Sequence, residues 1–163
     1  MLWVFIVTFV IFPGAFYDSS FDMLSSISDK DDRNSWYQII NLILFNVFDT
    51  IGRFMGGKFH LSGNTVIGLS VLRSVFIATT ILIAYKASPA FIFQEDWFKI
   101  LNMALFALSN GYVSTQCAIK APSYVKEDQR ESIGIFVGLF IALGIVSGSI
   151  MQIPIGGILP NNN

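Results

Sequence analysis

The stretch WYQIINLILFNVFDTIGRFMG, from Trp36 to Gly56, decides how this chain folds. It is apolar and long enough to cross a bilayer as an α-helix, which takes about 20 residues. It nevertheless carries Asn46, Asp49 and Arg53, whose spacing places them in one stripe of such a helix. A charged side chain at the centre of a membrane helix costs roughly 2.5–3.5 kcal/mol on insertion scales, so it usually faces a bundle interior or a watery cavity. We therefore predict that this helix, with Asn46, Asp49 and Arg53, forms the polar wall of a solute pathway.

Composition indicates a multi-pass integral membrane protein with an all-α fold. The chain has 163 residues, of which 53% are hydrophobic and 13% charged, whereas a soluble domain has about 25% charged residues. The net charge of −1 gives no reason to expect a nucleic-acid partner. The single cysteine, Cys117, excludes an intramolecular disulfide and a cysteine-based metal cluster. We expect neither a metal nor a cofactor.

Hydropathy predicts five transmembrane helices in a single transmembrane domain, residues 1–163. Their approximate limits are 2–17, 36–56, 65–85, 97–119 and 131–153. The first is slightly short for a span, and Met1 runs into it with neither a basic segment nor a cleavage site, so we predict no signal peptide. The short first helix suggests a chain that begins inside a helix, as a truncated product or gene model would.

Polar residues recur in the third and fourth predicted spans. Arg73 in the third has two readings of equal weight: it extends to the nearer interface, or it is a buried partner for a carboxylate. The fourth span contains Ser109 and Asn110, which either join helices through hydrogen bonds or line a cavity. We take Arg73, Asn110 and Ser109 as candidates for lining a cavity or for gating.

The fifth predicted span is rich in small residues. Glycines recur four residues apart in two pairs, which lets helix backbones approach closely in lipid. The predicted packing positions are Gly134, Gly138, Gly144 and Gly148. We expect no enzyme, because the chain has no metalloprotease motif and no serine paired with lysine or histidine in a plausible register.

Five stretches together resemble the equilibrative nucleoside transporters. FNVFDTIGR, ending at Arg53, resembles a signature of that family's eighth span, and FALSNGY, ending at Tyr112, is similar to its tenth. VLRSVFIATTIL resembles the ninth span, IFPGAF the end of the seventh, and PSYVKEDQRESIG the approach to the eleventh. Each motif alone is modest, but five in order cover nearly the whole chain. One departure is Thr50, where the family often has tryptophan, and this could alter helix packing or solute preference.

The resemblance implies the C-terminal five spans of an MFS-like eleven-helix bundle, with the N-terminal half of the family fold absent. It implies transport of a nucleoside or nucleobase by alternating access, with the C-terminus outside the cytoplasm and the plasma membrane favoured over an internal one. The expected partners are the solute, the bilayer, and the missing N-terminal half or a full-length relative. Two alternatives stay open. The resemblance favours solute binding by Asp49, Arg53 and Asn46, but the pair of Asp49 and Arg53 could instead be a salt bridge that only holds the bundle together. The chain could also be a truncated, non-transporting fragment that is inert or that associates with a full-length relative.

Overall fold

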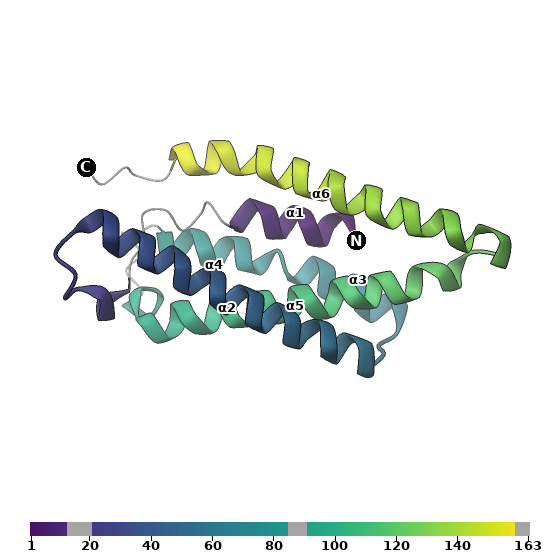
Figure 1. Cartoon of the computed structure of the whole chain (residues 1–163), viewed down its shortest axis with the longest axis horizontal. Coiled ribbons are helices and arrows are strands. Elements are labelled where there is room, and N and C mark those ends of the chain that lie inside the picture. The colour runs from purple at the N-terminus through teal and green to yellow at the C-terminus, as the bar shows by residue number, and fades with distance from the viewer. Residues whose placement is uncertain (13–20, 85–90, 159–163) are drawn as a thin grey trace.

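All regular structure in the computed structural model is helical within the residues that it describes, 1–12, 21–84 and 91–158. The long helices are α1 (Leu2–Ile11), α2 (Lys30–Lys58), α3 (Gly63–Leu72), α4 (Val75–Ala84), α5 (Asp96–Lys120) and α6 (Arg130–Ile158). Short 3₁₀ helices are η2 (Asp22–Leu24), η3 (Phe91–Gln94), η4 (Ala121–Tyr124) and η5 (Glu127–Gln129). The helices lie side by side along the long axis, and α1 lies between α6 and the others (Figure 1). The predicted all-α fold is confirmed for these ranges.

Helix α2 contains the predicted second span and extends beyond it at both ends. It begins after Asp29, whose side chain accepts a hydrogen bond of 2.8 Å from the backbone N–H of Asp31. Acidic residues in the first turn also favour this start, because they complement the helix dipole. The helix has 29 residues, which corresponds to roughly 43 Å. It therefore places Asp49 well inside the bundle.

The predicted third span is interrupted in the structure. α3 ends at Leu72 and α4 begins at Val75, and the turn between them is held by i→i+3 hydrogen bonds such as Ser74 N–H to Val71 C=O at 3.0 Å. The indole N–H of Trp3 on α1 donates to the Ser74 hydroxyl at 3.1 Å. Mid-helix 3₁₀ turns change the direction in which side chains point. This break is where Arg73 leaves the helix toward the bundle centre.

Two glycines allow α2 and α5 to touch backbone to backbone. A Cβ added at Gly111 would overlap the carbonyl oxygen of Asp49 and would lie 2.8 Å from the backbone nitrogen of Arg53. A Cβ at Gly52 would overlap the carbonyl oxygen of Leu108. No side chain can be accommodated at either position without separating the helices. This contact fixes the position of Asp49 along the axis of α5.

The four glycines predicted to pack the last span differ in their surroundings. A Cβ at Gly144 would lie 2.7 Å from the Cβ of Phe5, and one at Gly148 would lie 2.7 Å from the carbonyl oxygen of Ile6, so both face α1. Nothing among the described residues lies within 4 Å of a Cβ built on Gly134 or Gly138. The structure therefore places the second pair against a helix and leaves the first pair open.

Aromatic rings fill the centre of the helix bundle. Phe12, the residue directly after α1, stacks on Phe45 of α2, with ring centroids 4.8 Å apart. Phe106 of α5 contacts both Phe45 and Phe76, at 5.9 and 5.5 Å. Such pairs stabilise beyond the burial of their area. They join α2, α4 and α5 through ring contacts.

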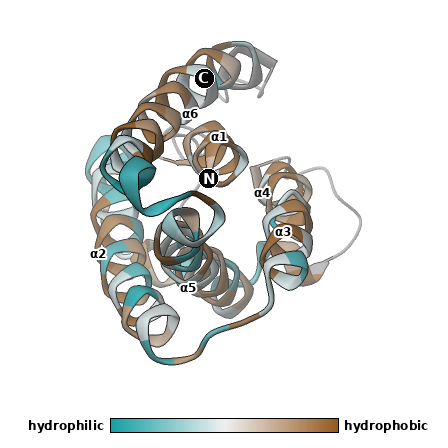
Figure 2. Cartoon of the chain, turned by 90° about the vertical axis from the view of Figure 1, so that its right-hand side faces the viewer, coloured by the Kyte–Doolittle hydropathy of each residue, from teal (hydrophilic) through white to brown (hydrophobic). Residues whose placement is uncertain are grey.

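Among the residues that the structure describes, three helical segments are long and apolar enough to cross a membrane: Lys30–Lys58, Gly63–Ala84 and Glu127–Pro154. Helix α1 is shorter, and the remainder of the first predicted span, residues 13–17, lies outside the described residues. α5 has 25 residues but carries more polar side chains. Much of the ribbon of α6 is coloured as hydrophobic (Figure 2), many large hydrophobic side chains are exposed, and in α6 only 11% of the most apolar stretch is buried within the chain. Surface of this kind is covered by lipid or by further protein.

The glycine contact predicts a large difference between two similar substitutions. Gly111→Ala should destabilise the bundle by about 3 kcal/mol, because the added methyl group meets backbone that cannot rotate away. Gly57→Ala is the matched control, since nothing among the described residues lies within 4 Å of its Cβ and alanine favours helix by about 1 kcal/mol over glycine. Equilibrium unfolding in mixed micelles measures both. Equal stability of the two variants would contradict the contact.

Candidate functional site

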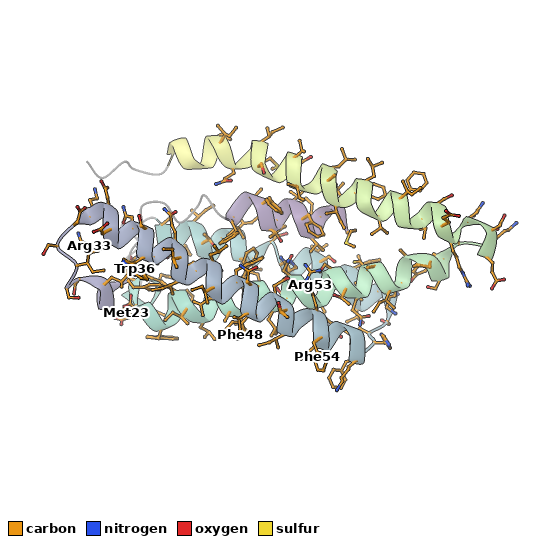
Figure 3. The ribbon with its side chains drawn as sticks, viewed as in Figure 1. Met23, Arg33, Trp36, Phe48, Arg53 and Phe54 are labelled. Carbon is orange, nitrogen blue, oxygen red and sulfur yellow. The ribbon has the colours of Figure 1, made fainter. Side chains whose placement is uncertain are left out.

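Asp49 and Arg53 form an ion pair within α2. The Nε of Arg53 lies 2.6 Å from Oδ2 of Asp49. The Asp49 side chain is 12% exposed and the Arg53 side chain 52%. Figure 3 shows Arg53 and Phe54 pointing to different sides of α2. The pair thus joins a buried carboxylate to a half-exposed guanidinium.

The hydrogen bonds of Arg53 leave much of its guanidinium without a partner. In residues 1–12, 21–84 and 91–158 its one hydrogen bond is the Nε contact with Asp49. A guanidinium has five N–H donors in a planar fork, so both terminal nitrogens are available. Arg53 can donate to a molecule that approaches the exposed side of α2.

Asn46 and Thr50 lie on the same exposed side of α2 as Arg53. Their spacing of four and seven residues puts the three in one stripe. The Asn46 amide donates to the carbonyl of Leu42 at 2.7 Å, and the Thr50 hydroxyl donates to the carbonyl of Asn46 at 2.7 Å. The structure does not bring Asn46 into hydrogen-bond contact with Asp49. It places Asn46 one turn away, on the surface that Arg53 shares.

Asn110 of α5 connects Asp49 to the rest of the bundle. Its Nδ2 donates to Oδ1 of Asp49 at 2.7 Å, and its Oδ1 accepts from Nη2 of Arg73 at 3.1 Å. Both Asp49 and Asn110 are buried, with relative exposures of 8% and 3%. The amide therefore mediates between a carboxylate and a guanidinium that do not touch.

Arg73 is fully enclosed, with a relative exposure of 2%. Its Nη1 donates to the Ser109 hydroxyl at 2.8 Å and to the carbonyl of Phe106 at 3.2 Å. Its guanidinium also lies over the Phe106 ring, 5.1 Å from the centroid, a favourable cation–π position. The side chain turns into the bundle and does not extend to an interface. Among the described residues, Asn110 is the side chain that links it to Asp49.

Thr8 of α1 completes the cluster and is a residue that sequence reasoning missed. Its hydroxyl accepts from Nη2 of Arg73 at 2.9 Å and lies 2.8 Å from Oδ1 of Asn110. The available signal was its position as the lone hydroxyl in the apolar run LWVFIVTFVIF. The four side chains come from α1, α2, α5 and the break between α3 and α4. We call Thr8, Asp49, Arg73 and Asn110 the polar cluster.

A cavity of about 570 Å³ borders one member of the polar cluster, Arg73. Arg73 and Ser109 line it, and its other walls include Leu72, Phe76 and Met55. Asn110, Asp49, Arg53 and Asn46 do not line it. On α2 the side chain of Met55 points to the flank opposite that of Asn46 and Arg53. The apolar cavity and the exposed polar stripe are therefore on different sides of α2.

The site offers hydrogen-bond donors and acceptors with no metal ligands beside them. Within the described ranges no group of three or more His, Cys, Asp or Glu side chains could hold a metal ion. The polar cluster has one carboxylate, one guanidinium, one amide and one hydroxyl, and the guanidinium of Arg53 lies beside its carboxylate. Such a set can bind and orient a polar molecule. It offers no nucleophile paired with a base.

The chain belongs to the nucleoside transporter family. The family model described as "Nucleoside transporter" matches residues 1–155. Membership identifies an integral membrane protein of a family of transporters and not of enzymes, and it agrees with the apolar helices described above.

Curated relatives agree with this assignment and are much longer than the chain. Equilibrative nucleoside transporter 1 of Mus musculus is 31% identical over 159 residues, which cover 91% of this chain and 34% of the relative. The protein of the same name from Homo sapiens is 28% identical, with 91% and 33% covered. Equilibrative nucleotide transporter 1 of Arabidopsis thaliana is 29% identical, with 91% and 31% covered. The chain spans about a third of the length of these relatives.

Removing the Asn110 amide should lower the free energy of unfolding more than removing a comparable amide on the same helix. Asn110→Leu removes the buried partner of Oδ1 of Asp49 and one of the acceptors of Nη2 of Arg73, and we expect a loss of about 3 kcal/mol in the free energy of unfolding. Asn102→Leu is the control, because Asn102 is also buried but accepts a hydrogen bond from the neutral hydroxyl of Thr79; we expect about 1 kcal/mol. Equilibrium unfolding in micelles compares them. A smaller loss for Asn110→Leu would contradict the bridging role.

Proposed function

We propose that this chain is the C-terminal portion of a nucleoside or nucleobase transporter that works by alternating access. Family membership supports the class of solute. The observation that carries the site is the half-exposed guanidinium of Arg53 held beside the buried carboxylate of Asp49. In lipid such charges are retained where they serve a pathway.

Nucleosides are neutral and dense in hydroxyl and ring hydrogen-bonding groups, so their site needs fixed donors and acceptors. The carboxylate of Asp49 accepts from ribose hydroxyls, and the terminal nitrogens of Arg53 donate to sugar or ring oxygens. Asn46 adds an amide one turn away on the same side. In the empty state Asp49 and Arg53 neutralise each other, which lowers the cost of keeping both in the membrane.

The alternative in which this ion pair only holds the bundle together is less well supported. Asp49 and Arg53 are four residues apart on one helix, so their contact joins no two helices. The link between helices is made by Asn110, which takes the other carboxylate oxygen. Arg53 is therefore not needed to hold two helices together, and solute binding accounts for the partial exposure of its side chain.

The proposed architecture is five spans within an MFS-like bundle. α1, α2, α3 with α4, α5 and α6 are the five, and the solute binds near the midplane between this part and six further spans. The C-terminus lies outside the cytoplasm, and the plasma membrane is the favoured location. Arg73, Ser109 and Asn110 contribute to gating, since they link the helices that surround the site.

Uptake measurements test the binding role of Asp49. The chain replaces the matching third of the mouse relative, and the chimera is assayed for uridine and adenosine uptake. Asp49→Ala should reduce uptake about tenfold or more, since hydrogen bonds to a charged group contribute about 1.5–3 kcal/mol. Lys58→Gln is the control, because Lys58 ends the same helix with its Nζ over the Phe54 ring. Equal uptake by Asp49→Ala and the parent chimera would contradict solute binding by Asp49.

The length of the relatives favours one further candidate function. A chain that covers 34% of the mouse relative could act as a non-transporting fragment that associates with a full-length relative. In that case the tagged chain should co-purify with the full-length protein from mixed membranes, and the chain alone in liposomes should show no uridine uptake. Uptake by the chain alone would contradict the inert alternative.

A further inference from the structure

We infer that Thr8 and Arg73 are positioning residues for the ligand-binding carboxylate of Asp49, acting through Asn110. This rests on the role of Asp49 in the proposed function. Neither residue lies on the exposed stripe of α2, and both are buried, Thr8 at 4% and Arg73 at 2%. Their effect on a solute is therefore indirect and depends on how the polar cluster orients Asp49.

The two partners of the Asn110 amide fix its orientation. An amide has a donor side and an acceptor side, and its partners decide which way it faces. Oδ1 lies 3.1 Å from Nη2 of Arg73, and Nδ2 lies 2.7 Å from Oδ1 of Asp49. Turning the amide over would put N–H against guanidinium N–H and oxygen against carboxylate. Arg73 therefore keeps the amide donor aimed at Asp49.

Arg73 can do this because its own orientation is fixed. Nη2 donates to Thr8 and Asn110, and Nη1 donates to Ser109 and the carbonyl of Phe106. All four terminal hydrogens thus have acceptors, on α1 and on α5. Without the Thr8 hydroxyl, Nη2 keeps one acceptor, Oδ1 of Asn110 at 3.1 Å, and the guanidinium loses the hydrogen bond that holds this nitrogen from the side of α1. Thr8 is the contact that ties α1 to the cluster.

Because Asn110 holds Oδ1 of Asp49, the terminal nitrogens of Arg53 stay available for a solute. A carboxylate beside arginine favours a bidentate pair in which both oxygens accept from one fork. Here Arg53 contacts Oδ2 through Nε, while Asn110 holds Oδ1. If Oδ1 were released, the carboxylate could turn both oxygens to Arg53 and occupy the nitrogens that a solute needs. Positioning by Thr8 and Arg73 prevents that collapse.

Thr8→Val tests the inference, and Thr80→Val is its matched control. Valine keeps the shape of threonine and removes the hydroxyl. Thr80 of α4 is equally buried, at 2%, but within the described residues its hydroxyl has no hydrogen-bond partner. The full 163-residue chain is placed in lipid nanodiscs with ¹³C-labelled aspartate, and the Asp49 carboxyl signal is assigned with Asp49→Asn. Uridine binding is measured on the same samples.

We expect Thr8→Val to shift the Asp49 carboxyl signal and to weaken uridine binding about three- to tenfold, the effect of one buried hydrogen bond. Thr8→Ser, which keeps the hydroxyl, should retain the parent signal and affinity, and Thr80→Val should leave both unchanged. If Thr8→Val does not fold, Arg73→Lys replaces it, because lysine keeps the charge but lacks the fork that reaches both Thr8 and Asn110; the same shift is expected.

The two readouts separate this inference from the proposed function. An Asp49 signal unchanged by Thr8→Val, or by Arg73→Lys in its place, overturns the positioning role whatever happens to uridine. A shifted signal that Thr8→Ser restores supports it. If the parent chain binds no uridine while the signal still shifts, the positioning of the carboxylate stands and solute binding by this chain alone fails.

Discussion

The rest of the structure depends on one hydrogen-bonded amide, that of Asn110 between Asp49 and Arg73. A buried carboxylate and a buried guanidinium are each costly in an apolar bundle, and removing one partner of such a pair is strongly destabilising. The amide lets opposite charges on different helices stabilise each other without direct contact. It also leaves the second carboxylate oxygen for Arg53, so the same group serves both the fold and the site.

Close helix approach makes that amide contact available. Gly52 and Gly111 let α2 and α5 touch along their backbones, so short side chains such as asparagine and aspartate can meet between them. Small residues play this role in membrane proteins because helix association in lipid relies on packing and on interhelical hydrogen bonds. The glycines and the polar cluster therefore act together. An alanine at Gly111 would separate Asp49 from Asn110 as well as the two helices.

The two flanks of α2 suit different surroundings. One carries Asn46, Thr50 and Arg53, and the other borders an apolar cavity of about 570 Å³. Many large hydrophobic side chains are exposed on the outer faces of the helices, as lipid contact or further protein requires. Since the chain spans about a third of its relatives, the polar flank is the side on which we propose that the rest of a transporter completes the solute pathway.

The sequence by itself determined the class of the protein, the helical fold and the stripe on α2, because hydropathy and helical spacing are local properties. Its family motifs already contained Asp49, Arg53, Arg73 and Asn110. Only the tertiary structure decided that Arg73 is enclosed and that it reaches Asp49 through an amide, since that depends on a break in a helix and on the separation of α2 and α5. The part played by Thr8 is of the same kind. A lone hydroxyl in an apolar run acquires a role only when another helix brings a guanidinium within 3 Å of it.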